Sequence, residues 1–367
     1  MRVTGFCLSA VLIGTALLGA PPPAAEEIPV VRPEMIREIT DISGDFFFQR
    51  PRQIKIAPDR GVLVRDRDKL LHFGPNGAFI RDYFEKGEGP GQLRGIADFF
   101  FTGEDRVVLG GFMPFTLLVK SLADGRVIRE HRDPESDGFA TLMYTDGDGY
   151  WLRTTDLAFA NLKTGINETV HKLFYCSPDH QKTDTGLTFS TLDVMIKKTD
   201  KEGRTMVAVN EYTRFHRAFD HRGYGYFSHT ERYRVQQLDL EKKKIIRKFS
   251  RPYEPVPFVE KEYERDIDRE LAEQANRKCF CDIQKLAMHG DDLLVFTSTL
   301  DPEKGVLVDV FGSDGTFRES FYLDLPGLER PDDIADQPLC FGRDCLWTAY
   351  PDEEENPMLV KMKFERL

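Results

Sequence analysis

Short segments in which apolar and polar residues alternate recur along the chain, and turns rich in glycine, asparagine and aspartate separate them. Residues 52–84 hold four such segments, QIKIA, VLVRD, LLHFG and AFIRDYF, joined by the turns DRG, RDK and PNG. Alternation of β-branched and aromatic residues over about five to eight positions is typical of strands. Asn76-Gly77 is a strong hairpin signal, because both residues accept positive φ at little cost. The pattern predicts a four-stranded antiparallel meander.

The same pattern returns in four further passages, which span residues 96–132, 141–175, 193–250 and 283–323. In the third passage we expect strands at TLMYTD, YWLRTT, AFANLK and ETVHKLFY. In the fourth we expect strands at DVMIKK, RTMVAVNEY, YRVQQLDL and KIIRKFS. A four-strand unit that recurs about every 40 to 50 residues favours a propeller, with one blade per unit, over a β-sandwich.

The sixth passage has one strand too few. DQPLCFG, CLWTAY and MLVKMKF, within residues 336–364, supply three strands, and a spare strand, MIREIT, stands at residues 35–40. If the spare strand joins the last unit, all six sheets have four strands and close into a ring. We therefore expect an all-β, six-bladed β-propeller over residues 26–367, with the N-terminal strand closing the last blade.

A glycine-rich link, EKGEGPGQL, follows the first meander at residues 85–93. Glycine permits the sharp turn from the outermost strand of one blade to the innermost strand of the next. A phosphate cradle would need a helix behind the glycines, whereas IADFFF is a strand. GEGPGQL after FGPNGAF resembles the NHL-type six-bladed β-propellers of exported bacterial proteins, in which a G-x-G-P-G-x-[FL] element links two blades. The resemblance covers one blade, at Gly87, Gly89, Pro90, Gly91 and Leu93.

Three longer segments interrupt the strand pattern, at residues 176–190, 213–232 and 251–281. All three stand where a propeller has blade-to-blade links or loops between second and third strands, which lie on one face. We therefore expect one decorated face around the fourth blade, and function commonly lies on such loops.

The third insertion is expected to contain a helix over residues 258–275, because its apolar residues recur at every fourth position. These residues are Val259, Tyr263, Ile267, Leu271 and Ala275. Pro257 suits the start of the helix. The apolar stripe either covers the ring as a partial lid or packs on blade surface for stability alone.

Candidate ligand-binding residues concentrate in the segment 213–232, which is basic and aromatic within an acidic protein. They are Arg214, His216, Arg217, Asp220, His221, Arg222, Tyr224, Tyr226 and His229. Arginine and tyrosine commonly anchor anionic or sugar-like ligands and protein partners. The three histidines are five and eight residues apart, which matches no common zinc motif, so we expect neither metal nor cofactor there. The alternative is a solvated loop held by its aromatic residues.

The cysteines fit an oxidising compartment, in which disulfides persist. Cys340 and Cys345 flank the tight turn FGRD, and we expect a disulfide across this hairpin. Cys279 and Cys281 are separated by one residue, and either could reach Cys176. The pairing of these three cysteines is left open.

The first 25 residues have the layout of a signal peptide: Arg2, an uncharged run from Gly5 to Ala20, and then PPPAA. The run is shorter than the roughly 20 residues of a membrane span, so we expect cleavage near Ala25 rather than an uncleaved anchor. Cys7 stands near the front of the run rather than directly after it, so no lipid attachment is expected. The mature protein is therefore expected to be periplasmic or secreted, without stable membrane insertion.

The net charge of −11 argues against a nucleic-acid binder, which needs a basic face. We expect an exported, non-enzymatic propeller that presents its decorated face to a protein, peptide or glycan ligand. The alternative is a propeller enzyme, a lactonase-like hydrolase or a lyase, with a divalent cation in the central channel. Four acids of the expected innermost strands are candidates for that cation: Asp98, Asp146, Asp193 and Asp336. They stand at different depths of their strands.

Overall fold

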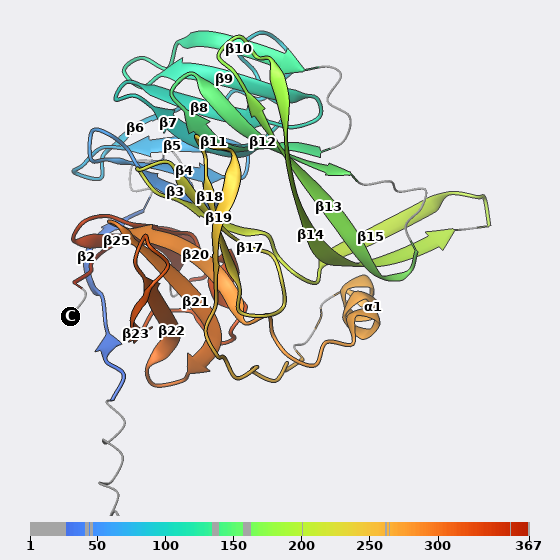
Figure 1. Cartoon of the computed structure of the whole chain (residues 1–367). Coiled ribbons are helices and arrows are strands. Elements are labelled where there is room, and N and C mark those ends of the chain that lie inside the picture. Colours follow the sequence, from blue (N-terminus) through green and yellow to red (C-terminus); the bar gives the residue numbers. More distant parts are fainter. Residues whose placement is uncertain are drawn as a thin grey trace, which may run out of the picture.

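The computed structural model describes residues 27–40, 44, 47–133, 139–156, 163–199, 201–260, 263, 265–352 and 354–365. The leader, 1–25, lies outside these residues. The described part of the chain forms six mainly antiparallel sheets of four or five strands (Figure 1). No helix in the described ranges is long and apolar enough to cross a membrane.

Three of the expected meanders form with the predicted strands. The first sheet contains β3 (Pro51–Ile56), β4 (Val62–Asp66), β5 (Lys69–Phe73) and β6 (Phe79–Asp82). The second contains β7 (Ile96–Thr102), β8 (Arg106–Gly111), β9 (Phe115–Ser121) and β10 (Val127–Asp133). The fifth contains β20 (Ile283–His289), β21 (Asp292–Asp301), β22 (Gly305–Phe311) and β23 (Phe317–Leu323). In each sheet the strands follow one another in chain order.

The N-terminal strand completes the sixth sheet. This sheet holds β24 (Leu339–Phe341), β25 (Cys345–Pro351) and β26 (Pro357–Lys363), and β2 (Glu34–Ile39) pairs antiparallel with β26. Ile39 lies opposite Leu359, as the closing-strand prediction requires. The short strand β1 (Val30–Val31) was not predicted; it pairs parallel with β23 at the outer edge of the fifth sheet.

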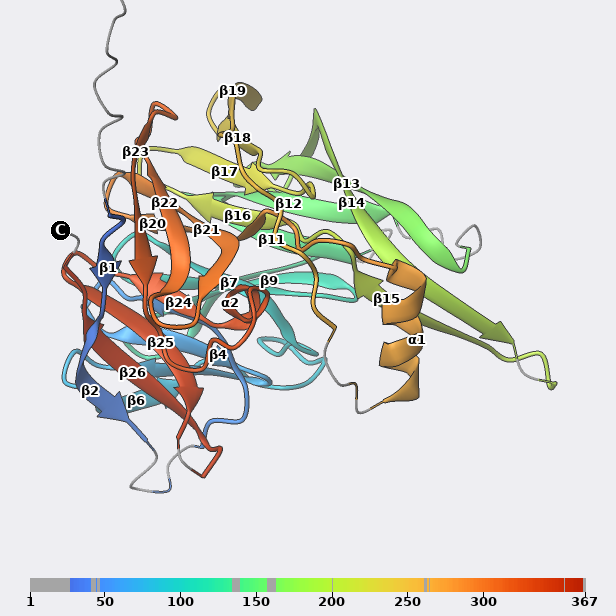
Figure 2. The ribbon, with the colours of Figure 1, turned by 90° about the horizontal axis from the view of Figure 1, so that it is seen from below.

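The third and fourth sheets differ from the prediction. The third sheet has five strands: β11 (Phe139–Asp146), β12 (Gly149–Asp156), β13 (Gly165–Cys176), β14 (Lys182–Thr199) and β15 (Thr205–Glu211). DVMIKK and RTMVAVNEY therefore belong to this sheet, within β14 and β15, and do not begin the fourth. Most of the expected strand AFANLK, residues 158–162, lies outside the described residues. The hairpin of β14 and β15 extends beyond the other sheets in both views (Figures 1 and 2).

The fourth sheet takes its two inner strands from the segment predicted as an insertion. It consists of β16 (His216–Phe219), β17 (Tyr224–Ser228), β18 (Val235–Asp239) and β19 (Lys244–Phe249). The segment 213–232 is thus mainly a hairpin inside the ring rather than a loop. The segment 176–190 is likewise a turn followed by the first half of β14. Both insertion predictions are wrong. The first half of β14 and the strands β16 and β17 alternate apolar and polar residues in the same way, so the sequence pattern does not show which sheet each strand joins.

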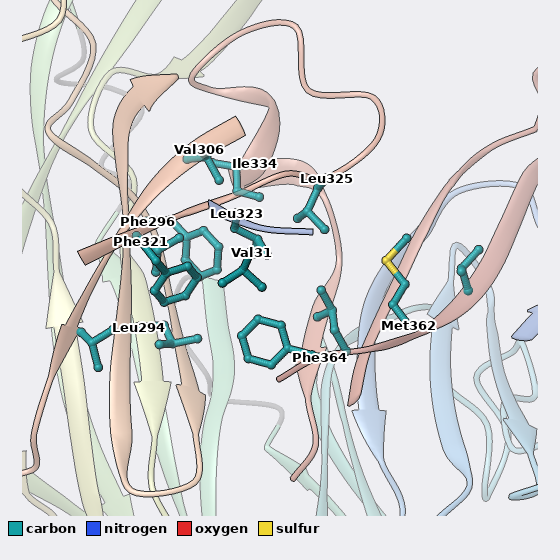
Figure 3. Packing of buried hydrophobic residues seen from close by; sticks show 14 of the residues in the cluster. Val31, Leu294, Phe296, Val306, Phe321, Leu323, Leu325, Ile334, Met362 and Phe364 are labelled. Carbon is teal, nitrogen blue, oxygen red and sulfur yellow. The ribbon is translucent and has the colours of Figure 1, made fainter. Parts of the chain in front are cut away.

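Alternate residues of the middle strands face opposite neighbouring sheets. On β21, Leu293 and Val295 pack towards the fourth sheet, whereas Leu294 and Phe296 pack towards the sixth. Figure 3 shows the second of these clusters, where Val31, Phe321 and Phe364 lie together. Because both faces are buried, these strands are almost continuously apolar.

Six apolar clusters of this kind join each sheet to the next. The last of them returns from the sixth sheet to the first: Trp347 and Leu359 pack with Val62 and Phe73, and Ile39 of β2 belongs to the same cluster. The succession of sheets is therefore closed by packing as well as by strand pairing.

The helix of the third insertion is shorter than predicted. α1 spans Asp266–Ala275, and Phe258, Val259 and Glu260 precede it without helical structure. Leu271 is buried against Val194 and Ile196 of β14. Figures 1 and 2 both show α1 beside the β14–β15 hairpin. The apolar stripe thus covers the extended end of the third sheet, and Val259 is 65% exposed. A second short helix, α2 (Asp333–Asp336), lies between β23 and β24.

The expected disulfide is not formed. All five described cysteines carry free thiols. The register of β24 and β25 places Cys340 opposite Trp347 and Phe341 opposite Leu346, so Cys345 does not face Cys340 across the hairpin. Both cysteines contribute to the apolar packing between the sixth and first sheets.

The closing strand supplies a stability test. Ile39 is 6% exposed and packs between the sixth and first sheets, whereas Ile36 on the same strand is 53% exposed. Ile39→Ala should lower the free energy of unfolding by about 2 to 5 kcal/mol, through lost burial and a cavity. Ile36→Ala should change it by less than about 0.5 kcal/mol. Urea unfolding followed by tryptophan fluorescence measures both; equal effects would show that β2 does not close the ring.

Candidate functional site

The innermost strands of all six sheets surround one cavity of about 380 Å³, which is the central channel of the ring. Each innermost strand contributes to its wall; examples are Lys55 on β3, Asp98 on β7 and Tyr144 on β11. Phe100, Phe219 and Phe341 make part of the lining aromatic. The channel therefore combines an apolar wall with a few charged groups.

A buried ion cluster centred on Asp98 occupies the channel. The Asp98 carboxylate accepts hydrogen bonds from Lys55 Nζ at 3.2 Å, from Gln53 Nε2 at 2.6 Å and from an Arg217 guanidinium nitrogen. Burial alone would raise the pKa of Asp98, but Lys55 and Arg217 outweigh it and hold the pKa below its usual range. Burial lowers the pKa of Lys55 to about 8 in spite of Asp98. The cluster links the first, second and fourth sheets across the channel.

A second cavity, of about 430 Å³, lies where the innermost strands begin; we call it the mouth cavity. Its wall is formed by α1, by the end of β15, by the segment 212–216 leading into β16, and by Arg330, Asp332 and Asp336 in and just before α2. Arg50, which precedes β3, and Gln284 on β20 also line it. Segments from the first, third, fourth, fifth and sixth sheets thus meet at this one place.

Five arginines and four carboxylates line the mouth cavity. Arg214 donates to Asp336 at 3.0 Å and lies 3.6 Å from Glu211. Arg277 donates to the carbonyl of Tyr212, and its guanidinium lies 4.5 Å from the centre of the Tyr212 ring. Such stacked guanidiniums are held in a fixed plane, which suits recognition of planar anions and of sugars.

Arg330 lies over the ring of Phe258, which Arg277 also approaches at 5.6 Å. Its guanidinium is 5.6 Å from the Phe258 ring and 5.5 Å from the Phe280 ring, and it donates to Asp332 at 3.0 Å. Its Nη2 atom is buried and has no hydrogen-bond partner. A ligand oxygen in the cavity would satisfy such a donor.

His216 is uncharged in this setting. Burial is the main cause, followed by the nearby charges of Arg214 and Lys285, and together they lower the pKa of His216 to about 3. A neutral imidazole at neutral pH offers one donor and one acceptor, so it can bind a ligand without adding a further positive charge.

The structure divides the nine predicted residues between two ends of the ring. Arg214 and His216 line the mouth cavity, and Arg217 lies in the channel. His229 lies against the third sheet, where Nδ1 contacts the carbonyl of Ser190 at 2.8 Å. The remaining five belong to the other end of the β16–β17 hairpin: Asp220, His221, Arg222, Tyr224 and Tyr226.

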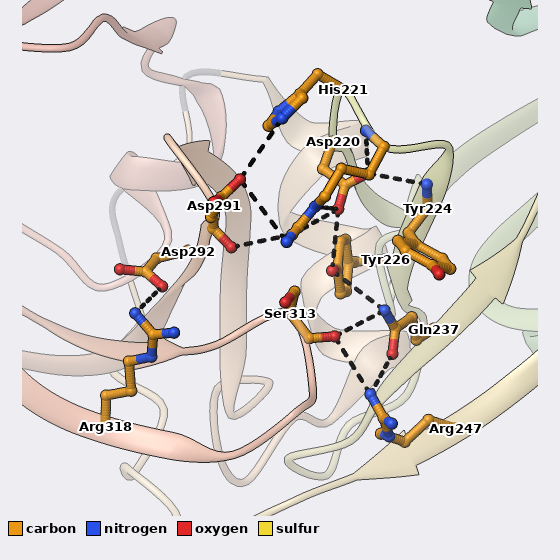
Figure 4. Close-up of polar contacts among 11 residues, drawn as sticks. Asp220, His221, Tyr224, Tyr226, Gln237, Arg247, Asp291, Asp292, Ser313 and Arg318 are labelled. Atoms are coloured by element: carbon orange, nitrogen blue, oxygen red, sulfur yellow. Dashed lines mark hydrogen bonds and ion pairs between the residues drawn. The ribbon is translucent and has the colours of Figure 1, made fainter.

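This other end forms a polar network of its own (Figure 4). The Asp220 carboxylate pairs with Arg222 at 3.0 Å and accepts the backbone N–H of Tyr224 at 2.9 Å. His221 lies 3.6 Å from Asp291 in the turn of the fifth sheet. These contacts hold the β16–β17 turn to the next sheet, so they are satisfied within the fold.

Sequence reasoning missed several residues at the mouth and in the channel. Lys55, Arg65 and Arg153 stand in alternating strands, where a charged residue ordinarily faces solvent. Only their positions on the first and second strands of propeller blades could have indicated that these side chains are buried, since those strands have little access to solvent. Arg277 and Arg330 lie outside the strands and carry no sequence signal.

The four candidate acids for a divalent cation do not gather. Asp98 is held by two cations in the channel, and Asp146 is exposed at the end of β11. Asp193 accepts the hydroxyl of Thr169 on β13, and Asp336 pairs with Arg214 at the mouth. In the described ranges no group of three or more His, Cys, Asp or Glu residues could hold a metal ion. The residues present therefore do not fit a cation in the channel.

Comparison with known proteins identifies the fold. No family model and no curated protein sequence matches the chain. A Bacteroides fragilis protein classed as exported is 13% identical with a TM-score of 0.50, over 90% of this chain and 95% of that one. A gluconolactonase from Xanthomonas campestris is 12% identical with a TM-score of 0.45, over 95% and 100% of the two chains.

The β-propeller domain of Cps50 (Swd1) from Myceliophteria thermophila is 8% identical with a TM-score of 0.41, over 90% of this chain and 99% of that one. At such identities the likeness concerns the fold alone. The ring of six small sheets around a central channel is itself the architecture of a β-propeller.

The Asp98 cluster predicts a large effect of one substitution. Asp98→Ala leaves Lys55 and Arg217 buried without their shared carboxylate, which should lower the free energy of unfolding by about 3 to 5 kcal/mol. Asp146→Ala, on the exposed end of the neighbouring innermost strand, should change it by less than about 0.5 kcal/mol. Chemical denaturation measures both. A tolerated Asp98→Ala would contradict the assignment of Asp98 as the counter-ion of the channel.

The neutral state of His216 predicts a pH dependence. The unfolded chain protonates this histidine near pH 6.5, whereas the folded chain does so only near pH 3. Its contribution to stability is therefore complete above about pH 6.5 and is lost as the pH falls towards 3. His216→Gln should reduce the loss of unfolding free energy between about pH 7.5 and 4.5. His221→Gln, at an exposed position, serves as the control. An unchanged loss in His216→Gln would refute a buried neutral imidazole.

Proposed function

We propose that the chain is an exported, non-enzymatic binding protein that holds a protein, peptide or glycan ligand at the mouth of a six-bladed β-propeller. The observation that carries this proposal is the mouth cavity beneath α1. A ring of regular blades needs no helix or extended hairpin at this place. Here α1, the β14–β15 hairpin and α2 all contribute to its wall.

The chemistry of the mouth cavity supports a polar ligand. Tyr212, Phe258 and Tyr263 supply aromatic faces, and Arg277 and Arg330 supply fixed donors beside them. Aromatic surfaces with a few well-placed polar groups are typical of ligand sites. The cavity is large enough for one or two sugar rings or for a short peptide segment.

Export rests on the leader at residues 1–25 and on the NHL-type link at residues 85–93. The shared fold of the exported Bacteroides fragilis protein supports it. The propeller domain then covers residues 26–367 in the periplasm or outside the cell. The free thiol of Cys345 is buried and that of Cys340 is half-buried between sheets, where packing rather than bridging accounts for them.

The enzymatic alternative requires a divalent cation in the channel. Asp98 is the one candidate acid that reaches the channel, and its oxygens are already engaged by Lys55, Gln53 and Arg217. A non-enzymatic role therefore agrees better with the arrangement of charges. Metal analysis of the purified protein tests this, because a stoichiometric divalent cation would favour the enzyme.

Filling the mouth cavity tests the proposed function. Ala272 on α1 lines the cavity, and Glu273 is exposed and does not. Ala272→Trp should reduce retention of ligands on glycan and peptide arrays by at least about tenfold, a loss of about 1.4 kcal/mol. Glu273→Trp should bind within about twofold of the native protein. Thermal unfolding of both variants verifies that they remain folded.

Two array results would count against the mouth as the binding site. Either Ala272→Trp binds as well as Glu273→Trp, or the native protein retains no glycan and no peptide with a dissociation constant below about 1 mM.

A further inference from the structure

Four cations lie close to the charged groups of the mouth and the channel, although the mouth cavity itself is lined by other residues. Arg65, Arg153 and Lys285 are partly or fully withdrawn from solvent, and Arg52 lies at the rim. None of the four forms an ion pair with any carboxylate of the described residues. Withdrawing a charge from water without a counter-ion is costly, so such groups ordinarily have one.

Arg65 and Arg153 occupy equivalent places in two blades. Each stands on the second strand of its sheet and reaches to the start of the innermost strand of a following sheet. Arg65 donates to the carbonyls of Ile96 and Ala97 at 2.7 and 2.8 Å, and Arg153 lies 5.1 Å from the Phe215 ring just before β16. The Nε atoms of both arginines are buried without a hydrogen-bond partner.

Lys285 adds a third positive charge at the same level. It stands near the start of β20 and donates only to the carbonyls of Ala335 and Gln337, at 3.0 and 2.7 Å. Burial lowers its pKa to about 8. Carbonyl oxygens solvate the ammonium group, and the nearby charge of Asp336 offsets only part of the effect of burial.

Most of the nearby carboxylates are engaged by other cations. Asp98 pairs with Lys55 and Arg217, and Asp336 and Glu211 pair with Arg214. Asp193 is also near Arg153, and its carboxylate accepts the hydroxyl of Thr169. Other arginines add to the effect of burial. After burial, the largest cause of the lowered pKa of Arg153, to about 10, is the charge of Arg217. For Lys285 the charge of Arg214 lowers the pKa, although that of Asp336 raises it by more.

We propose that an oxyanion, the carboxylate or phosphate group of an anionic ligand, binds at the inner end of the mouth among Arg52, Arg65, Arg153 and Lys285. This inference rests on the proposed function and specifies its ligand as acidic: an acidic glycan, a sugar phosphate or an acidic peptide. The unpaired Nε atoms supply donors for its oxygens. In a protein with a net charge of −11, this local positive field also draws anions towards the mouth.

Succinate, its neutral diamide succinamide, and inorganic phosphate test the site by isothermal titration calorimetry at low ionic strength. The native protein should bind one succinate or one phosphate and no succinamide. Arg153→Met should weaken the binding by at least about tenfold. Because it removes an unpaired buried charge, it should also raise the unfolding temperature of the unliganded protein. Arg65→Met is a second variant with the same expected loss of binding.

Arg126→Met, at a side chain that is 78% exposed, is the control and should leave binding unchanged. The two anions distinguish a carboxylate ligand from a phosphate ligand by their relative affinities. The inference is overturned if neither anion binds, if succinamide binds as well as succinate, or if Arg153→Met lowers the unfolding temperature and leaves anion binding intact. The native protein could bind ligands on the arrays, lose this binding in Ala272→Trp, and yet bind neither succinate nor phosphate. That combination would support the proposed function and refute only this inference.

Discussion

The pairing of β2 with β26 is the constraint on which the arrangement of the site depends. Without β2 the sixth sheet has three strands and presents the open edge of β26. Ile39 would also be missing from the apolar cluster that joins the sixth sheet to the first. Arg50 and Asp336, which are far apart in sequence, line the same mouth cavity only because this junction brings the first and sixth sheets together. The strand pairing that closes the ring therefore also brings the residues of the mouth cavity together.

Two groups of charged residues inside the ring differ in whether they form ion pairs. Deep in the channel, Asp98 with Lys55 and Arg217 forms a compensated cluster that ties three sheets together. At the mouth, the second-strand arginines Arg65 and Arg153 remain without a carboxylate. Cations that are paired with a carboxylate help to specify how the sheets pack. Cations without such a partner favour the binding of a ligand of opposite charge.

Much of the fold could be predicted from the sequence, since alternation and turn residues locate most strands and the spare strand at residues 35–40 locates the closure. The errors occur where the local sequence pattern does not show which strand or sheet a segment pairs with. A hairpin that extends one sheet and a hairpin that begins the next have the same alternation, so β14 and β15 were assigned to the wrong sheet. Pro257 likewise indicates where a helix can start, but tertiary packing on β14 sets the start of α1 at Asp266.

The candidate site could be predicted only in part. The basic and aromatic segment 213–232 does supply Arg214 and His216 to the mouth. Arg217 lies in the channel and His229 lies against the third sheet. The other five lie towards the far end of the same hairpin, because the four-residue strand β16 leads away from the mouth. The cations of the second strands could not be found, since their exposure depends on the neighbouring sheet.

The most direct test of the account is a crystal structure of the native protein grown with succinate at low ionic strength. The account predicts a carboxylate at the inner end of the mouth, within hydrogen-bond distance of Arg65 or Arg153, beneath α1. A mouth that stays free of succinate, while Arg65 and Arg153 keep the same unpaired positions, would contradict it.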